Sequence, residues 1–128
     1  MEELDESSVI RLIGRIVQAW NKADLTTVCE AYAHDAVFVS NTGLVRGREA
    51  ILTRYRAQYD SPFAMPILSL QLLQLFSSRS GSQSSPNMAS AVLEWQLTHP
   101  GGQRQNGFSL IVLVQRPPDI LIIQDASV

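Results

Sequence analysis

The stretch AWNKADLTTVCEAYAHDAVFVSNTGLVRGREAILTRY, residues 19–55, decides the fold because its apolar periodicity changes twice. Residues 25–32 keep the three- and four-residue spacing of a short helix, and Asp24 stands where an N-cap would accept amide hydrogens. The sequence then turns to a β-branched and aromatic run, which predicts a strand over residues 36–39. After a turn and a brief second strand, helical spacing returns and predicts a helix over residues 48–59.

The flanking sequence extends this pattern in both directions. Upstream, apolar residues recur at helical steps and predict a first helix that ends near Trp20. Downstream, short apolar runs separated by turn residues predict strands. These strands cover residues 68–76, 89–97, 108–114 and 120–123.

Two details of the second half are also predicted. In the strand over residues 68–76, alternation places Leu68, Leu70, Leu72 and Phe76 on one face. The Ser-rich segment 79–87 predicts an exposed loop. Three helices followed by strands joined in sequence indicate an α+β fold with an antiparallel sheet. We expect the 128 residues, 1–128, to form a single domain.

Composition excludes several classes of function. The chain has 10 basic and 12 acidic residues, a net charge of -2, and its basic residues are scattered, so we expect no nucleic-acid partner. No apolar run is long enough to cross a membrane. Cys29 is the single cysteine; we expect it to be a buried core residue in a cytoplasmic protein. His34 and His99 lie far apart without other ligands at zinc spacing, so we predict no metal and no cofactor.

Residues in both halves follow the pattern of a known superfamily. The first helix ends in an aromatic residue and an asparagine, and a Tyr-Ala-x-Asp-Ala run and a Gly-Arg-Glu follow. The C-terminal stretch GFSLIVLVQRPPDILIIQDASV, residues 107–128, is similar to the superfamily's closing strands. The chain resembles the nuclear-transport-factor-two-like superfamily, which includes ketosteroid isomerases and SnoaL-like polyketide cyclases. It is most similar to small bacterial SnoaL-like proteins of unknown function. The residues that carry the resemblance are Trp20, Asn21, Asp24, Tyr32, Ala33, Asp35, Ala36, Gly47, Arg48 and Glu49.

The resemblance implies a particular shape. Three N-terminal helices pack on a strongly curved, mostly antiparallel sheet, and together they form a cone with an internal pocket. Large aromatic residues around a concave sheet make an apolar or aromatic ligand the expected occupant, although each of these residues also suits a plain core. The predicted lining residues are Trp20, Tyr32, Phe38, Tyr55, Tyr59, Trp95 and Phe108.

The resemblance does not extend to steroid-isomerase chemistry. Ketosteroid isomerases use a carboxylate base and an oxyanion site made from a tyrosine and a protonated aspartic acid. In this sequence the base position is Ser40, the tyrosine position is Ile16, and the third position falls near Leu110. None of these side chains supplies the required group, so we expect no ketosteroid isomerisation.

Asp125 is the candidate catalytic residue, because cyclases of the superfamily are described as using a pocket aspartate as acid or base. The histidine that usually follows it is Ala126 here. The structural alternative is that Asp125 is an edge or interface residue paired with an arginine. Asp35, at a helix-to-strand junction, is expected to bond local amides. Glu94 alternates with apolar neighbours and faces either the pocket or solvent.

Two functions of different classes therefore remain. The first is a small-molecule pocket domain, either a binding protein or a cyclase- or isomerase-like enzyme. The second is a non-enzymatic association module. The strands over residues 108–114 and 120–123 are apolar on both faces, and the helices can cover only one. We therefore expect a homodimer through the outer face of the sheet, tested by a charge at Ile111 or Leu113, whichever faces outward.

Overall fold

The first helix, α1 (Glu6–Asn21), begins at a reciprocal cap. The structure, a computed structural model, describes residues 3–77 and 87–128. The Asp5 carboxylate accepts from the Ser8 amide at 2.9 Å, and the Ser8 hydroxyl oxygen accepts from the Asp5 amide at 3.0 Å. These two bonds satisfy donors that the first turn of a helix leaves unpaired. The apolar face of the helix then buries Val9 and Leu12.

The second helix, α2 (Leu25–Cys29), confirms the predicted cap. Asp24 accepts from the Thr27 amide at 3.2 Å and from its hydroxyl at 2.6 Å. The helix is shorter than predicted, since Tyr32 already belongs to the first strand. Cys29 is buried, as predicted, and burial raises the pKa of its thiol to about 11. It therefore stays protonated and packs as a small apolar residue.

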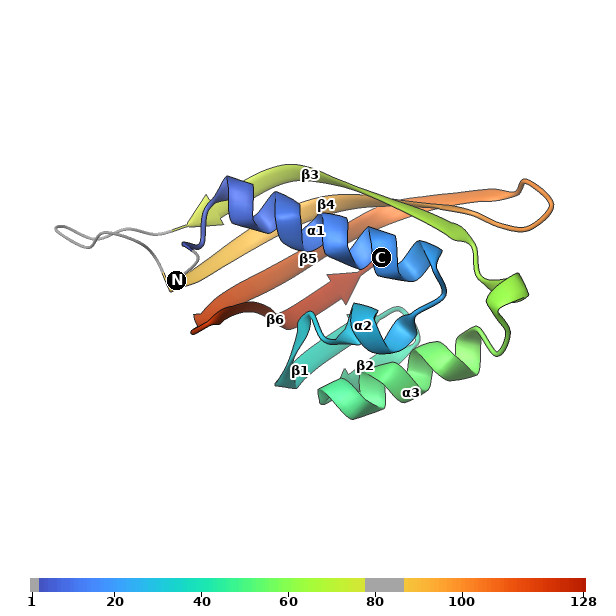
Figure 1. Ribbon diagram of the computed structural model, residues 1–128, viewed down its shortest axis with the longest axis horizontal. Helices are drawn as coiled ribbons and strands as arrows, with labels where there is room; N and C mark the ends of the chain where they lie inside the picture. The colour runs from blue at the N-terminus through green and yellow to red at the C-terminus, as the bar shows by residue number, and fades with distance from the viewer. Residues whose placement is uncertain (1–2, 78–86) are drawn as a thin grey trace, which may run out of the picture.

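A six-stranded mixed sheet follows, with the strand order β2-β1-β6-β5-β4-β3 (Figure 1). Four neighbouring pairs are antiparallel, and β1 and β6 run parallel. The remaining elements are β1 (Tyr32–Ser40), β2 (Gly43–Arg46), α3 (Arg48–Gln58), the 3-10 turn η1 (Pro62–Ala64), β3 (Ile67–Ser77), β4 (Met88–Thr98), β5 (Arg104–Arg116) and β6 (Asp119–Ser127).

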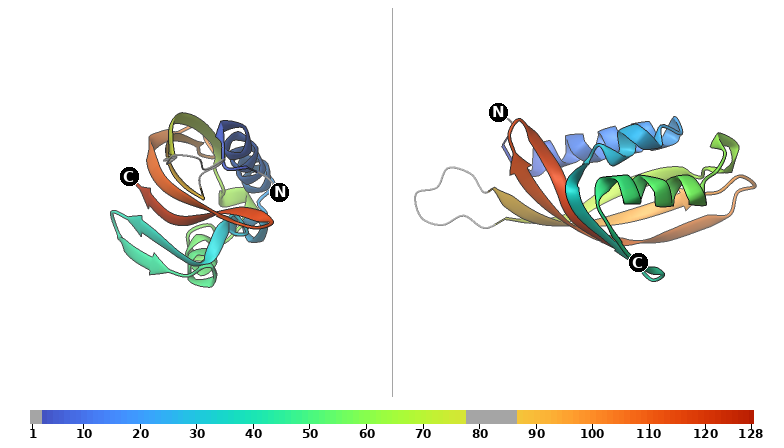
Figure 2. Two further views of the ribbon diagram at one scale, coloured as in Figure 1. Left: turned by 90° about the vertical axis from the view of Figure 1, so that its left-hand side faces the viewer. Right: turned by 90° about the horizontal axis from the view of Figure 1, so that it is seen from below.

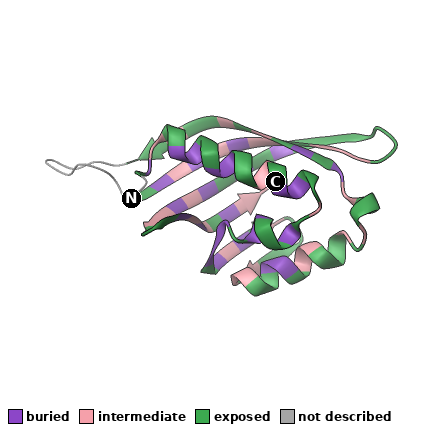
Figure 3. Ribbon diagram, viewed as in Figure 1, coloured by how far each residue is buried: buried purple, intermediate pink, exposed green. Residues whose placement is uncertain are grey.

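The sheet is curled but does not close, and the helices lie on its concave side (Figure 2). Helix α1 packs against β3, and α3 packs against β1 and β2. Buried and more exposed residues alternate along the strands, so the core lies on the concave inner face (Figure 3). This arrangement confirms the predicted α+β fold. Within the part of the chain that the structure describes, no helix or strand covers the convex outer face.

The end of α1 is fastened to the start of β3. The Trp20 indole Nε1 donates to the Pro66 carbonyl at 2.9 Å. The Asn21 side chain makes two bonds to Leu68: its Nδ2 donates to the carbonyl at 3.1 Å and its Oδ1 accepts from the amide at 2.9 Å. These three bonds fix the helix to the sheet at the wide end of the cone.

The prediction for residues 68–76 is wrong at Phe76. The register between β3 and β4 shifts between Leu72 and Gln74, where one extra residue enters the strand. Such a bulge reverses the alternation beyond it. Leu75 therefore takes the inner face, and Phe76 is 66% exposed on the outer one. The loop predicted over residues 79–87 lies, apart from Asn87, outside the described residues.

Asp35 accepts a hydrogen bond from its own backbone amide, which agrees with the predicted local bonding, and it also has a distant partner. Its carboxylate binds the Arg116 guanidinium at 2.8 Å, between β1 and the end of β5. That hydrogen bond holds the pKa of Asp35 below its usual value. Both side chains are largely exposed, so solvent screens the pair and limits its contribution to stability. None of the described helices is long and apolar enough to cross a bilayer.

Candidate functional site

Asp125 lies on the inner face of β6, with only 7% of its surface exposed. Its neighbours in register are Phe38 on β1 and the buried Ile111 on β5. The Tyr32 hydroxyl donates to Oδ2 at 2.6 Å, and the Ser127 hydroxyl donates to Oδ1 at 2.8 Å. Asp125 is thus not at an edge of the sheet, and within the described residues no salt bridge joins it to an arginine, so the edge position and ion pair of the structural alternative are not observed.

The hydrogen bonds continue beyond the carboxyl on both sides. On one side, the Ser127 hydroxyl lies 2.7 Å from that of Ser109 on β5, which is also buried. On the other side, the Tyr32 hydroxyl interacts with that of Tyr55 from α3. A polar chain thus crosses an otherwise apolar inner face. Both oxygens of Asp125 already accept hydrogen bonds within it.

Burial controls the ionisation of this group. It raises the pKa of Asp125, while the hydroxyls of Tyr32 and Ser127 and the charge of Arg54 oppose the shift. Burial also raises the pKa of Tyr32 and of Tyr55, and the nearby carboxylate adds to both shifts. The tyrosines therefore remain neutral donors, while the carboxyl titrates closer to neutral pH than an exposed aspartate.

This shift predicts a pH dependence of stability. Between the unfolded and the folded pKa of Asp125, the folded chain holds more protons. The stabilising contribution is fully present below the unfolded pKa and is lost as the pH rises through the folded one. Asp125→Asn cannot ionise, so the free energy of unfolding of the wild type minus that of the variant should fall as the pH rises. Urea denaturation between about pH 4 and pH 8 measures this difference.

Asp35→Asn is the control. Because the pKa of Asp35 is lowered in the folded chain, the free energy of unfolding of the wild type minus that of this variant should rise with pH. The contribution of Asp35 is present above the unfolded pKa and is lost as the pH falls through the folded one. A difference for Asp125→Asn that stays constant with pH would show that the carboxyl ionises as freely in the folded chain as in the unfolded chain.

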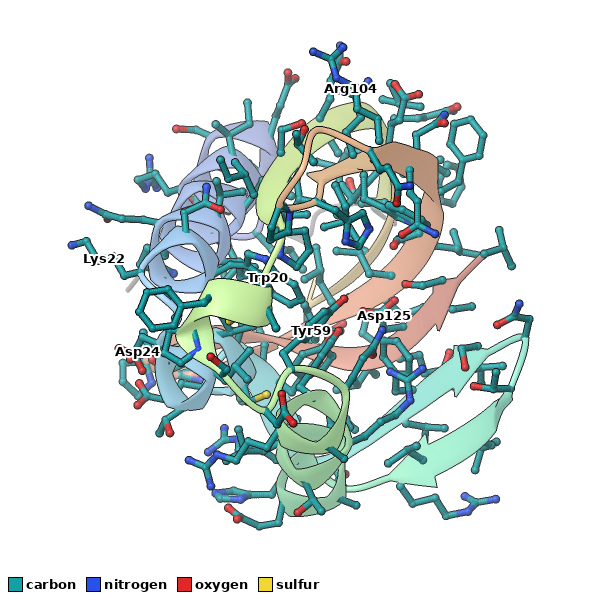
Figure 4. The ribbon with its side chains drawn as sticks, turned by 90° about the vertical axis from the view of Figure 1, so that its right-hand side faces the viewer. Trp20, Lys22, Asp24, Tyr59, Arg104 and Asp125 are labelled. Atoms are coloured by element: carbon teal, nitrogen blue, oxygen red, sulfur yellow. The ribbon has the colours of Figure 1, made fainter. Side chains whose placement is uncertain are left out.

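Aromatic side chains cover this polar chain on the helix side. The rings of Trp20 and Tyr55 meet edge to face with centroids 5.5 Å apart, and those of Trp20 and Tyr59 at 5.4 Å. Phe38 and Tyr55 are 6.0 Å apart. Figure 4 looks into the wide end of the cone, where Trp20, Tyr59 and Asp125 lie between the helices and the sheet. The structure thus brings together five of the predicted lining residues. Four are in ring contact, and the fifth, Tyr32, is linked to them through its hydroxyl interaction with Tyr55; the four are Trp20, Phe38, Tyr55 and Tyr59.

Arg54 brings a positive charge to the same place, although no pattern in the sequence singled it out. It projects from α3, and its guanidinium carbon lies 4.8 Å from the centre of the Phe38 ring. Its Nη2 also donates to the Ser40 hydroxyl at 3.3 Å. Phe38 is the register neighbour of Asp125, and the charge of Arg54 acts to lower the pKa of that buried carboxyl.

The other two predicted lining residues lie on opposite faces of the sheet. Trp95 is on the inner face of β4, and its indole packs directly against Gly107 of β5. Its Nε1 is buried and has no hydrogen-bond partner among residues 3–77 and 87–128. Phe108 is 47% exposed and pairs with Glu94 on the outer face. Its assignment to the pocket is therefore wrong, and Glu94 faces away from the interior.

Two hollows open near the wide end. The larger, about 720 Å³, lies between η1 and the β4–β5 hairpin; its walls include Phe63, His99 and Gln105. The smaller, about 230 Å³, lies between α2 and the end of α3 and reaches Tyr59. Asp125 lines neither of them. We place the candidate site at Asp125 because the buried ionisable chemistry is there, whereas both hollows are open surface grooves.

A metal centre is not formed by the described residues, in which no three His, Cys, Asp or Glu side chains lie close enough to hold an ion. His99 bonds Gln105 through Nε2 at 2.6 Å, and His34 is exposed on β1.

Comparison with known proteins agrees with the fold. Residues 13–115 match the model of the SnoaL-like domain family. An NTF2-like protein of unknown function from Shewanella oneidensis superimposes with a TM-score of 0.82 at 19% identity, over 94% of this chain and 96% of that one.

Two further solved structures with different descriptions also superimpose on this chain. A ketosteroid isomerase-like protein from Erwinia carotovora gives a TM-score of 0.72 at 14% identity, over 97% of this chain and 96% of that one. ActVI-ORFA from Streptomyces coelicolor gives 0.71 at 12% identity, over 95% and 94%. At these identities the likeness concerns the fold alone. A comparison with curated protein sequences gave no match.

Proposed function

The chain belongs to the SnoaL-like domain family, and from that premise we propose that the interior of its cone binds an apolar or aromatic small molecule on which Asp125 acts as an acid or base. The observation that carries the proposal is the buried carboxyl held by Tyr32 and Ser127 beneath the aromatic cluster. Ionisable groups with raised pKa values on a concave apolar surface are typical of ligand sites. Burial of the lone cysteine fits action in the cytoplasm.

The proposed chemistry is proton transfer. An ionised Asp125 would accept a proton from the carbon next to a carbonyl, and the protonated carboxyl would return it. The fixed hydrogen bonds from Tyr32 and Ser127 orient the carboxyl for this step. Steroid isomerisation is not part of the proposal, since Ser40 and Ile16 lack the necessary groups and Leu110 lies 51% exposed on the outer face.

The experiment uses 1-tetralone as an aromatic ketone probe. Binding to the folded chain should raise the melting temperature. In D2O, the wild type should speed exchange of the hydrogens next to the carbonyl, as followed by proton NMR. Asp125→Asn should bind the ketone and lose at least about 100-fold of that exchange, a typical general acid–base contribution. Asp35→Asn, an exposed carboxylate outside the cone, serves as the control.

Exchange that persists in Asp125→Asn would count against the acid–base role. A wild type that neither binds apolar aromatic compounds nor promotes exchange would count against the whole proposal. Tyr32→Phe separates the two parts, since it removes one orienting bond while Asp125 remains. We expect it to slow exchange by less than Asp125→Asn does.

A second candidate function is association with another copy through the outer face. One row of apolar residues crosses five adjacent strands in direct register, and none of its members is buried. An uncovered apolar surface of this kind is typical of an interface, and a two-fold partner presenting the same row would cover it. The row, called the outer row below, consists of Leu44, Val39, Ala126, Leu110 and Val92.

A further inference from the structure

Two serine hydroxyls stand in series behind the Asp125 carboxyl. Ser127 donates to Asp125 Oδ1 at 2.8 Å, and the Ser109 hydroxyl lies 2.7 Å from that of Ser127. Ser109 and Ser127 are partners in the register between β5 and β6, and Asp125 lies two residues before Ser127 on the same face of β6. The backbone ladder of the sheet therefore holds the three side chains in one row.

Packing does not account for a serine at position 109. Its neighbours on the inner face of β5 are Gly107 and the buried Ile111, and the buried Leu93 stands opposite on β4. Only 7% of Ser109 is exposed. Burying a hydroxyl among apolar side chains is costly unless it forms hydrogen bonds. Ser109 therefore fits a role in the hydrogen-bonded row better than a role in the core.

The two sides of the hydrogen-bonded chain lead to different surroundings. On the tyrosine side, Tyr32 is buried, and the Tyr55 ring beyond it lies within the aromatic cluster. On the serine side, Ser127 is only half-buried, and the next residue, Val128, is exposed. The serine side is thus the one that leads from the buried carboxyl toward water.

We infer that Ser127 passes protons between Asp125 and water, and that Ser109 holds the Ser127 hydroxyl in line for this transfer. The inference rests on the proposed function, since it says how the acid–base group is reset after each reaction. A serine hydroxyl both donates and accepts, and its hydrogen rotates to suit its partners. Ser127 can therefore donate to the ionised carboxylate and accept from the protonated carboxyl.

The transfer leaves both residues in their ordinary forms. After Asp125 has taken a proton from a ligand carbon, the Oδ1–H bond breaks as a new O–H bond forms at Ser127 Oγ. The original O–H bond of Ser127 breaks in the same step, and its proton joins a solvent water. Asp125 returns to the carboxylate, Ser127 remains a neutral hydroxyl, and water carries the charge away.

The first test uses the full chain without ligand. The 2.6 Å bond between Tyr32 and Asp125 is short and charge-assisted, so the NMR signal of its proton should lie downfield of the amides. Tyr32→Phe assigns the signal. Ser127→Ala should slow the exchange of this proton with water by at least about 10-fold, which is less than the contribution of a whole acid–base group. Saturation transfer measures the rate, and a wild-type signal broadened by fast exchange should become sharp in the variant.

Further variants complete this test. Ser127→Thr keeps a hydroxyl and should restore the wild-type exchange rate. Ser109→Ala should slow exchange by less than Ser127→Ala, because it removes a positioning bond and leaves the relay hydroxyl. Ser127→Cys keeps the size of the side chain but is a weak donor and acceptor, so it replaces Ser127→Ala if that chain does not fold. Ser69→Ala is the matched control, since Ser69 is an exposed serine on β3.

The second test follows 1-tetralone labelled with deuterium or tritium next to its carbonyl, in ordinary water. With the wild type, deuterium should wash out faster than tritium, because breaking of the bond to carbon limits the rate. In Ser127→Ala the captured isotope leaves Asp125 slowly and returns to the same carbon. Wash-out should therefore slow by at least about 10-fold, and the difference between the two isotopes should largely disappear.

The outcomes separate the relay from the proposed function. Slower wash-out in Ser127→Ala with an undiminished isotope difference would mean that Ser127 only orients the carboxyl, and would overturn the relay. An unchanged exchange rate of the Tyr32 proton in the chain without ligand would overturn it as well. A wild type that does not speed wash-out, but whose Tyr32 proton still depends on Ser127, would overturn the catalytic proposal and leave the proton path intact.

Discussion

Gly107→Ala should destabilise the protein by about 2–3 kcal/mol, the upper part of the range for overpacking a filled core. A Cβ on Gly107 would lie closer than 3.0 Å to the Val128 carbonyl oxygen and to two ring atoms of Trp95. Val128 is held in place by two backbone bonds to Phe108. The clash therefore has to displace either the end of β6 or the indole. Thermal unfolding should show a fall in melting temperature of about 10 °C.

Gly14→Ala is the matched control. Gly14 lies in α1, and a Cβ added there would have nothing within 4 Å, so the same substitution should stabilise by about 0.5–1 kcal/mol. Trp95→Ala should make Gly107→Ala less costly, because it removes one of the two clashing groups. If Gly107→Ala unfolds at the same temperature as the wild type, the indole of Trp95 does not pack closely against Gly107 in β5.

Leu110→Asp should convert a dimer into monomers. Leu110 lies at the centre of β5 within the outer row and is 51% exposed in the single chain. A carboxylate buried there by a two-fold partner would lack a counter-charge, which should weaken association at least about 100-fold. Sedimentation at micromolar concentrations would show the mass of one chain instead of two. Ile111 and Leu113, named from the sequence as test positions, both face the core, so neither reports on the interface.

Phe63→Asp tests whether any exposed apolar residue would have the same effect. Phe63 is 90% exposed on η1, away from the outer row. Its variant should keep the mass of the dimer. A wild type that sediments as a single chain would contradict association altogether. A Leu110→Asp variant that remains a dimer would place the interface on another surface.

Much of the fold could be predicted because local pattern and final structure agree. The caps and the alternation of β4 depend on near neighbours in sequence, so Asp24 and Trp95 lie where their spacing indicates. Phe76 could not be placed, because the bulge before it depends on pairing with β4 rather than on its own strand. Phe108 was misplaced because aromatic size suggests a pocket, whereas strand register decides which face a residue takes.

The candidate site was predicted as single residues and not as an arrangement. Asp125 and Tyr32 were both named, yet their 2.6 Å bond joins positions 93 residues apart, and no local pattern reveals such a contact. Arg54 resembles one more surface charge on an amphipathic helix. Its position over the Phe38 ring, from which its charge acts on Asp125, is apparent only in the folded chain.

The two hydrogen bonds between the Asn21 side chain and the backbone of Leu68 also affect whether another chain can add a strand at the free edge of the sheet, which is β3. An unpaired edge strand is a template on which other chains add strands and aggregate. The amide of Asn21 occupies both backbone groups of Leu68, as an incoming strand would, and the irregularity after Leu72 interrupts the spacing further along β3. At the opposite edge β2 is only four residues long. Both edges of the sheet are therefore poor templates for strand addition. The convex face can stay apolar without fibril growth through repeated addition of strands at either edge.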